Sequence, residues 1–520
     1  MNRLPTGIQS FPILREDNCI YVDKTEVILR LLETGSTLFF SRPRRFGKSL
    51  LVSTLCELFK GNKKLFEGLA IYDKWDWDKK HPVVRIDWSS FAHRTIPAAE
   101  EGLMYCLRKT AQEYGVELTS KLAANALQEL IGCLHEKTGE RAVVLVDEYD
   151  MPIINALGKP DFETHREFLH DFYGLLKGAG DHLRFIFFTG VSKFAGLSVF
   201  SGLNNIRDVT LDPALATLCG YTDQELKEYF PEHLAAVAKE QNMPIEQLLE
   251  KTKFWYNGYS WDGETSVYNS FSILLFLGAK YFDTWWFDTG TPTFLIKILL
   301  EKNDIAPFMQ PVIVNTLASR TFNAEDSDIV SLLFQTGYLT IKKIKRESFP
   351  IEYTLDVPNF EVRDAFLTWL LTAYNVSSVL KTQQLAVRTK KSILAGNVVE
   401  LERDLREMIA GIPYKLHIPR EAYYHSLFLV WLKLLGFDIQ GEYLTDIGRI
   451  DAVWRLGERM ILVEIKCGRR EEDSEKLLAE AMKQIKEKHY ADAFGGIQKT
   501  TCLAIVYTYT NRKLACRIEA

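Results

Sequence analysis

The sequence predicts a multidomain α/β protein, with a parallel sheet near the amino end and a second α/β unit at the carboxyl end. The chain has 520 residues, more than one hydrophobic core usually serves, so we expect two or three domains. In the first part, short runs rich in β-branched and aromatic residues alternate with longer helical patterns, as in parallel sheets covered by helices on both faces. The strands expected there are 37–41, 83–87, 142–147 and 183–189.

The composition is that of an ordinary globular protein, with 47% hydrophobic and 25% charged residues. The 63 Lys and Arg residues against 68 Asp and Glu residues give a net charge of −5, so contact with nucleic acid would need a local basic patch. No apolar run approaches the roughly 20 residues of a membrane span. The eight cysteines include no CxxC pair. We therefore expect a cytoplasmic protein that does not contact the membrane.

The middle of the chain is mainly helical. Thr222 and Glu225 form a capping-box pattern ahead of a helix that must stop near Pro231. Further on, one hairpin candidate, 338–344 with 351–357, stands among helices, which indicates a winged-helix-like module. The segment that follows resembles polar helices with a basic start, and we place the main linker between residues 377 and 410.

A phosphate-binding loop is indicated at residues 41–49, SRPRRFGKS, between an expected strand and an expected helix. A loop at a helix amino terminus offers free backbone N–H groups and the positive end of the helix dipole. Gly47 would let the backbone close on phosphates, Lys48 would reach the β- and γ-phosphates, and the Ser49 hydroxyl would bind Mg²⁺. The full Walker A pattern is G-x-x-x-x-G-K-[ST], and Arg42 stands in place of its first glycine.

A second motif supports this interpretation. The apolar strand that follows about a hundred residues later ends in Asp147 and Glu148, the Walker B arrangement. Asp147 would hold hydrated Mg²⁺, and Glu148 would orient and deprotonate the attacking water. Thr189 ends the next strand, where such ATPases carry a polar γ-phosphate sensor. A strand that merely ends in solvated acids is the alternative for this motif alone, but the two motifs in order favour nucleotide hydrolysis.

Five segments together resemble the predicted AAA-ATPase-like family, over roughly residues 4 to 290. The resemblance implies ATP as the nucleotide, with Lys48, Ser49, Asp147 and Glu148 in the roles just given, and an arginine in place of the first glycine is that family's own form. Arg44 and Arg45 are further candidates for phosphate contact, with ordinary surface arginines as the alternative. The segments are YVDKT (21–25), RPRRFGKS (42–49), VDEYDMP (146–152), TGVSKFAGLSVFSGLNN (189–205) and FWYNGYSWDG (254–263).

The last hundred residues contain a carboxylate–lysine constellation. Asp451 lies in one expected strand, and Glu464 and Lys466 lie in the partner strand. Residues i and i+2 of a strand share a face, so Glu464 and Lys466 project together, and a hairpin would bring Asp451 towards them. The two carboxylates would bind Mg²⁺, which polarises a scissile phosphate, while Lys466 would orient water or stabilise developing charge. A solvated hairpin with an ordinary Glu–Lys pair is the alternative.

The order of these elements resembles the PD-(D/E)XK nuclease superfamily, over about residues 415 to 510. Helices on either side carry EAYYHS (421–426) and AMKQIK (481–486). The resemblance implies Asp451, Glu464 and Lys466 as the catalytic core, with Glu421 and Gln484 assisting. His425 is a further candidate ligand, although a histidine beside two tyrosines is more often a packed residue.

The net charge of this unit favours nucleic-acid binding only weakly. Residues 411–520 contain 17 Lys and Arg and 15 Asp and Glu, a net charge of +2, whereas binding of duplex DNA depends on neutralised phosphates. Glu471, Glu472 and Asp473 oppose a local patch. The residues that would form such a patch are Arg449, Lys466, Arg469, Arg470, Lys483 and Lys486.

We expect four parts in the chain: residues 1–220, a P-loop AAA-like ATPase core; 221–290, a helical lid; 291–410, a helical and winged-helix-like connector; and 411–520, a nuclease-like domain. The expected function is an ATP-binding and ATP-hydrolysing protein with a Mg²⁺-dependent nuclease that acts on DNA or RNA and is gated by the nucleotide. The alternative is a non-cleaving, ATP-dependent regulatory or nucleic-acid-binding switch. A small-molecule kinase fits less well, because Glu148 suits water activation. A homo-oligomer that supplies an arginine finger is compatible with the sequence.

Overall fold

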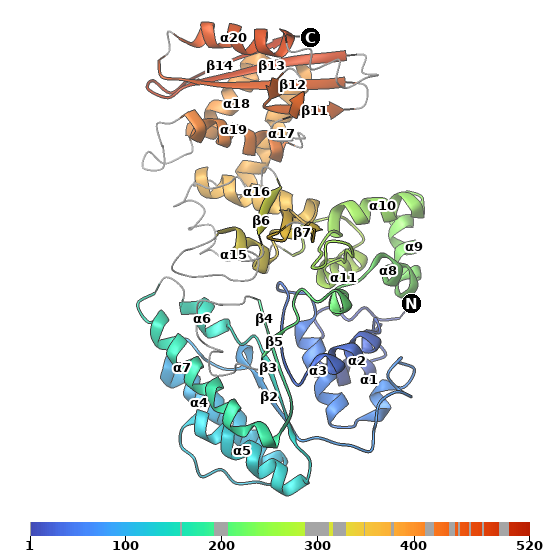
Figure 1. Cartoon of the computed structure of the whole chain (residues 1–520). Helices are drawn as coiled ribbons and strands as arrows, with labels where there is room; N and C mark the ends of the chain where they lie inside the picture. Colours follow the sequence, from blue (N-terminus) through green and yellow to red (C-terminus); the bar gives the residue numbers. More distant parts are fainter. Residues whose placement is uncertain are drawn as a thin grey trace. The chain divides into compact units, whose positions relative to one another are not determined.

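Figure 1 shows the chain as a computed structural model. The structure describes residues 2–156, 159–191, 206–286, 311–315, 329–347, 349–375, 379–410, 421–435, 443–445, 448–456, 459–470, 473–487 and 499–519. Two compact units are present: residues 1–290 with 313–361, and residues 291–312 with 362–520. In the part of the chain that is described, every helix is too short or too polar to span a bilayer.

The first unit is built on a parallel sheet of five strands in the order β2-β3-β4-β1-β5. The four strands expected from the sequence are present, and β5 is an additional short edge strand. Strands β1 and β3 are buried along their whole length, which explains their continuous apolar sequences. The strands are β1 (Thr37–Ser41), β2 (Val83–Asp87), β3 (Ala142–Asp147), β4 (Leu183–Gly190) and β5 (Arg207–Asp208).

Helices cover both faces of this sheet. In Figure 1, α4, α5 and α7 gather on one side of the strands and α1, α2 and α3 on the other. Helix α3 is almost wholly buried, because apolar residues occupy most of its circumference. The helices are α1 (Phe11–Glu16), α2 (Thr25–Thr34), α3 (Lys48–Phe59), α4 (Ile96–Glu113), α5 (Ala123–Thr138), α6 (Met151–Ala156) and α7 (Phe162–Gly174).

Four helices follow the sheet and share a core of their own. The capping box is present in full: the Thr222 hydroxyl accepts from the Glu225 amide, and the Glu225 carboxylate accepts from the Thr222 amide. The same Glu225 carboxylate accepts from Lys24 Nζ at 2.5 and 2.7 Å, which attaches the amino-terminal segment to this helix. The helices are α8 (Asp223–Tyr229), α9 (Pro231–Glu240), α10 (Ile245–Tyr256) and α11 (Ser270–Ala279).

The predicted hairpin is also present. Strands β7 (Thr340–Lys345) and β8 (Glu352–Asp356) pair antiparallel, and β6 (Val312–Asn315) adds a third strand beside β8. Helix α15 (Ile329–Thr336) precedes the hairpin. The Ser260 amide donates to Thr340 Oγ1 at 2.7 Å, so the hairpin is attached to the segment between α10 and α11.

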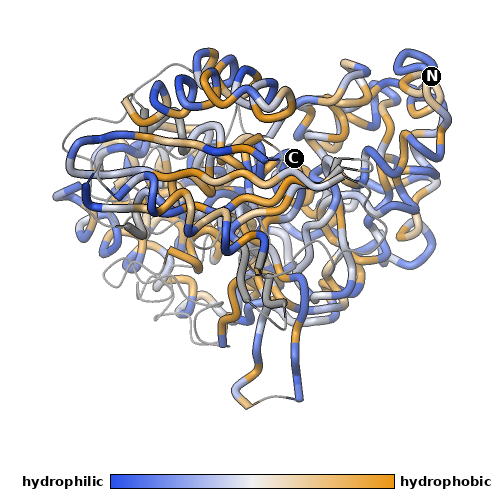
Figure 2. Tube along the Cα trace, turned by 90° about the horizontal axis from the view of Figure 1, so that it is seen from above, coloured by the Kyte–Doolittle hydropathy of each residue, from blue (hydrophilic) through white to orange (hydrophobic). Residues whose placement is uncertain are grey.

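The second unit has a mixed sheet in the order β11-β12-β13-β14, in which only β12 and β13 run parallel. A short hairpin, β9 with β10, precedes it. Figure 2 shows the long strands near the carboxyl terminus as mainly hydrophobic. Helix α20 packs its apolar stripe of Leu478, Ala481 and Ile485 on this sheet, as the sequence indicates. The elements are α19 (Glu421–Leu434), β9 (Tyr443–Thr445), β10 (Gly448–Ile450), β11 (Ala452–Leu456), β12 (Arg459–Gly468), α20 (Ser474–Glu487), β13 (Lys499–Thr508) and β14 (Lys513–Glu519).

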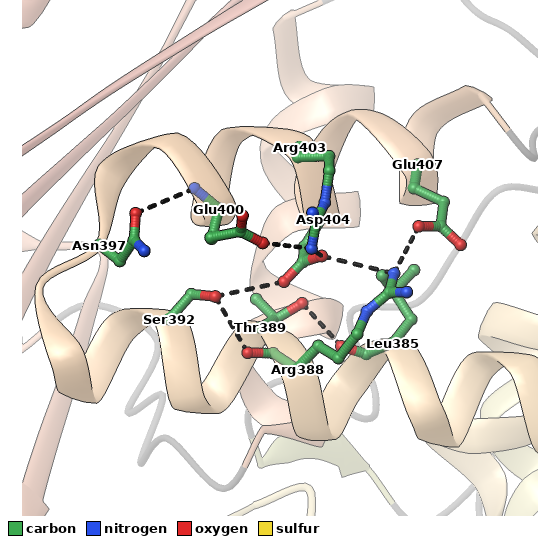
Figure 3. A network of polar contacts seen from close by, with 9 residues as sticks. All are labelled: Leu385, Arg388, Thr389, Ser392, Asn397, Glu400, Arg403, Asp404 and Glu407. Atoms are coloured by element: carbon green, nitrogen blue, oxygen red, sulfur yellow. Dashed lines mark hydrogen bonds and ion pairs between the residues drawn. The ribbon is translucent and has the colours of Figure 1, made fainter.

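The segment expected to be a linker lies inside this second unit. Helices α17 (Val379–Ala395) and α18 (Val398–Ala410) pair around the buried Asp404, as Figure 3 shows. Ser392 Oγ donates to this carboxylate at 3.3 Å, and Arg388 lies 3.4 Å away. Helix α18 also binds β14, since Glu402 accepts from the Cys516 amide at 2.9 Å. Together with the buried apolar face of α18 (Leu401, Leu405, Met408 and Ile409), these contacts place the two helices in the second unit.

Glu225→Ala tests the attachment of the amino-terminal segment. Lys24 is only 8% exposed, and burial lowers its pKa while Glu225 opposes that shift. The substitution leaves a buried ammonium without its carboxylate and breaks the capping box, so we expect a loss of about 3 kcal/mol in the free energy of unfolding. Urea unfolding measures it. Glu228→Ala, at an exposed position of the same helix, should change it by less than about 0.5 kcal/mol. Equal effects of the two changes would contradict this assignment.

Candidate functional sites

The phosphate-binding loop has the backbone that its motif predicts. Gly47 caps α3 with φ 91°, a left-handed conformation that favours glycine. The free N–H groups of the first turn of α3 therefore face the loop. Lys48 is 3% exposed, and its Nζ donates to the Pro43 carbonyl at 3.2 Å and lies 3.5 Å from Glu148 Oε1. The predicted phosphate ligand and the predicted base are thus already neighbours.

The predicted Walker B and sensor residues meet at the same edge of the sheet. Strand β4 lies between β1 and β3, and the pairing of Val146 with Phe188 places Asp147 beside Thr189 at the next position. Both side chains are fully buried. Thr189 Oγ1 has no hydrogen-bond partner among the described residues, whereas the Ser49 hydroxyl and Lys48 lie close enough to Asp147 to lower its pKa. Burial, reinforced by the charge of Glu148, raises the pKa of Asp147 to about 6.

A cavity of about 270 Å³ opens over the phosphate-binding loop and Glu148. Its lining includes Lys48, Ser49 and Glu148 on one side and residues of the amino-terminal segment and α11 on the other. Arg44 and Arg45 also line it, and the Arg45 guanidinium lies 4.6 Å from the centre of the Phe271 ring. The donor set and the buried Asp147, whose pKa is raised, fit a nucleotide with a divalent cation, because a cation at this carboxylate would offset the cost of its burial.

Arg42, which replaces the first glycine of the motif, points away from this cavity into the protein. It is 1% exposed, and its Nη1 donates to the carbonyls of Ser41 and Thr210, both at 2.9 Å. Its Nη2 donates to the Leu215 carbonyl at 3.3 Å, and its guanidinium lies 3.8 Å from the centre of the Trp261 ring. Sequence reasoning missed this role, because every partner except Ser41 and Phe40 is distant along the chain.

The predicted residues of the second site also lie together. The pairing of Ala452 with Val463 places Asp451 opposite Glu464 at the next position. Asp451 Oδ2 accepts from the Ile465 amide at 2.7 Å, which holds this carboxylate against β12 beside Glu464. The Glu464 side chain is 2% exposed. Two acidic groups are therefore held at one point of the sheet.

Lys466 and Gln484 complete this cluster. Lys466 Nζ donates to Glu464 Oε1 and to Gln484 Oε1, both at 2.9 Å, so α20 contributes directly to the site. His425, on α19, places its Nε2 2.9 Å from Asp451 Oδ1. The histidine is thus a partner of the predicted metal ligand, a role that spacing in the sequence did not indicate.

Some predicted groups fall outside the described side chains. Glu421 begins α19, and Arg449 lies in β10, but their side chains are outside the description, as are Glu471 and Glu472. Among the side chains that are described, no set of three or more His, Cys, Asp or Glu residues has the arrangement of a metal centre.

Comparison with known proteins gives a family match for each of the two parts of the chain that carry these clusters. Residues 5–200 match the family described as predicted AAA-ATPase, and residues 419–517 match the PD-(D/E)XK nuclease superfamily. An uncharacterized protein in the vnfD 5' region of Azotobacter chroococcum mcd 1 is 37% identical over 502 residues, which cover 95% of this chain and 93% of that protein. The chain belongs to the predicted AAA-ATPase family and carries a PD-(D/E)XK nuclease superfamily domain. Both resemblances inferred from sequence motifs are thereby confirmed.

The two matches enclose the two clusters. The AAA-ATPase match contains the phosphate-binding loop, Asp147, Glu148 and Thr189, and the nuclease superfamily match contains Asp451, Glu464, Lys466 and Gln484. The AAA-ATPase match ends at residue 200, so Trp261, which stacks on Arg42, lies beyond it.

Arg42→Gly restores the complete Walker A pattern but removes the buried hydrogen bonds of Arg42. It tests which of the two contributes more to stability and ATP binding. Removal of a buried, triply hydrogen-bonded guanidinium should cost about 3 kcal/mol of stability and weaken ATP binding at least about tenfold. Thermal unfolding and ATP titration measure the two effects. Arg45→Gly is the matched contrast, because Arg45 is exposed with φ 70°, so glycine there should leave the melting temperature equal or higher. Tighter ATP binding by Arg42→Gly would contradict the anchoring role.

Proposed function

We propose that the protein binds and hydrolyses ATP at the phosphate-binding loop, and that the carboxylate–lysine cluster cleaves phosphodiester bonds of nucleic acid with a divalent cation. We further propose that the nucleotide state controls cleavage. The observation that carries the nuclease proposal is the contact of Lys466 with both Glu464 and Gln484, beside an Asp451 held by the Ile465 amide. An ordinary surface Glu–Lys pair does not explain a glutamate that is 2% exposed.

At the ATPase site, each residue has a task that follows from its position. The amides at the start of α3 and Lys48 would bind the phosphates, and Ser49 with Asp147 would hold Mg²⁺, which neutralises phosphate charge when bound. Glu148 would orient the attacking water and accept its proton, while Thr189 would hydrogen-bond the γ-phosphate or that water. Glu148 Oε1 lies 3.5 Å from Lys48 Nζ, so the proposed base would lie next to the phosphate that Lys48 binds.

At the nuclease site, Asp451 and Glu464 would hold a divalent cation, which activates water and polarises the phosphate when bound. Lys466 would stabilise the negative charge that develops on the phosphoryl oxygens. Gln484 keeps the ammonium in place, and His425 orients the Asp451 carboxylate from the side opposite the Ile465 amide. The overall reaction adds water across the P–O bond, leaving a phosphate monoester and a free hydroxyl.

A local basic surface next to this site supports nucleic acid as the partner. Arg469 and Arg470 are exposed directly after β12. The amides of Tyr509 and Thr510 donate to the carbonyls of Gly468 and Arg469 at 3.1 and 3.2 Å, which brings the turn that carries Arg512 and Lys513 alongside. These four cations would provide phosphate contacts that the net charge of the whole domain does not suggest.

Glu464→Gln tests the nuclease proposal on a panel of single- and double-stranded DNA and RNA with Mg²⁺ or Mn²⁺. Loss of the buried carboxylate should lower cleavage at least about 100-fold, because the cation loses a charged ligand, while ATP hydrolysis stays unchanged. Glu480→Gln, at an exposed position on α20, is the control. Absence of metal-dependent cleavage by the unmodified protein on every substrate would favour a switch that binds nucleic acid without cutting it.

Lys48→Ala tests nucleotide control separately. The substitution removes the charge that binds the β- and γ-phosphates, so ATP hydrolysis should fall at least about 100-fold. Cleavage should then proceed at the same rate with and without ATP. The rate ratio with and without ATP, measured for the unmodified protein and for Lys48→Ala, is the decisive quantity. A ratio near one for both proteins would exclude gating and leave the two activities independent.

A further inference from the structure

Glu361 is a buried carboxylate that neither proposed reaction uses. It is the second residue of α16 (Phe360–Asn375), is fully buried, and lies 89 and 75 residues along the chain from its partners Ser272 and Trp286. Ser272 Oγ, on α11, donates to Glu361 Oε2 at 2.9 Å and to Oε1 at 3.2 Å. The Trp286 amide donates to Oε1 at 2.7 Å. A buried acid with this many donors specifies a geometry, because its hydrogen bonds leave it little freedom.

Trp286, and the first turn of α11 that carries Ser272, also hold the backbone of the phosphate-binding loop. The indole Nε1 of Trp286 donates to the Arg44 carbonyl at 3.0 Å. At the start of α11, Asn269 Nδ2 donates to the same carbonyl at 3.5 Å, and Ser270 Oγ donates to the Arg45 carbonyl at 3.3 Å. Asn269 also caps α11 through the amides of Phe271 and Ser272. The loop is therefore connected to Glu361 along two short routes, through Trp286 and through the first turn of α11.

The segment that enters α16 makes close contacts with the end of α10 and with Gly258. The Phe360 ring lies 4.6 Å from that of Trp255 and 5.1 Å from that of Phe254, both at the end of α10. A Cβ atom on Gly258, whose φ is 115°, would come within 2.1 Å of the Pro358 carbonyl oxygen. Lys342 Nζ donates to that carbonyl at 2.9 Å. A shift of the first turn of α16 must therefore involve the segment between α10 and α11.

We propose that Glu361 is a positioning residue that couples the phosphate-binding loop to α16, the helix that continues into the unit with the nuclease site. The first two residues of α16 belong to the first unit and the remainder, from Val362, to the second. A change in the Arg44 and Arg45 backbone on nucleotide binding would reach α16 through Trp286, Ser272 and Glu361. This inference rests on the proposed nucleotide site and gives the proposed gating a physical path.

The protonation of Glu361 is compatible with this role. Burial raises its pKa to about 8, so near neutral pH the carboxyl is largely uncharged and acts through hydrogen bonds rather than as an ion. Glutamine has the same shape without charge and retains an acceptor for the Trp286 amide. Glu361→Gln is therefore the conservative replacement, whereas Glu361→Ala removes the bridge.

Hydrogen exchange on the full chain tests the coupling, with the Mg²⁺ complex of a non-hydrolysable ATP analogue, AMP-PNP, as the probe. In the unmodified protein, AMP-PNP should slow exchange at least about threefold both in residues 41–55 and in α16. In Glu361→Ala, the protection of residues 41–55 should persist while the response of α16 disappears. Glu361→Gln should behave as the unmodified protein. Trp286→Phe, which keeps the ring but removes the bond to Arg44, should lose most of the α16 response.

Two results would overturn the proposal. In the first, AMP-PNP protects residues 41–55 of the unmodified protein but does not change exchange in α16. In the second, AMP-PNP still slows exchange in α16 of Glu361→Ala. A second measurement needs no nucleotide. Glu361→Ala alone should speed exchange at least about threefold in residues 41–47 and α16 together, and an effect confined to α16 would also refute the coupling. Absence of AMP-PNP protection in residues 41–55 would count against the nucleotide site, and the second measurement would still decide the role of Glu361.

Discussion

The phosphate-binding loop of the first unit is held in place by side chains that donate hydrogen bonds to its backbone carbonyl groups. The carbonyls of Ser41, Arg44 and Arg45 each accept from a side chain, and Lys48 donates back to Pro43. A phosphate-binding loop must turn its N–H groups towards the ligand, so its carbonyls point into the protein and need donors there. In this chain the donors come from the side chains of Arg42, Asn269, Ser270 and Trp286.

This arrangement explains why an arginine suits the position of the first Walker glycine. A glycine is needed where the backbone adopts a positive φ or where a side chain would obstruct the ligand. Arg42 has neither problem, because its side chain leaves the loop towards Thr210, Leu215 and Trp261. The guanidinium thereby links the loop to a segment far along the chain, and burial lowers its pKa to about 9. The cost of burying it is offset by three carbonyls and two aromatic faces.

The sequence indicated what depends on neighbours in the chain and missed what depends on distant contacts. The strands of the first sheet, the capping box at Thr222 and the cluster of Glu464 and Lys466 follow from periodicity and spacing alone. The second function of Glu225, the pairing of His425 with Asp451, and the role of Glu361 depend on partners 26 to about 200 residues away. The contact of residues 377–410 with the second unit has the same origin, since α18 binds β14 through Glu402 and Arg406, residues that look solvated in the sequence.

The buried polar groups divide into two kinds, and the difference bears on function. Asp404 and Glu361 have hydrogen-bond donors or arginines of the fold beside them, which offset part of the cost of burial, although burial still raises the pKa of both. Asp147 is equally buried, and the Ser49 hydroxyl and Lys48 lower its pKa less than burial and the like charge of Glu148 raise it. Folding does not favour such a carboxylate without a compensating partner, because an uncompensated buried charge costs several kcal/mol. A ligand of the working protein is the natural source of that compensation, and a cation held with a nucleotide phosphate supplies it where Lys48 and Ser49 already converge.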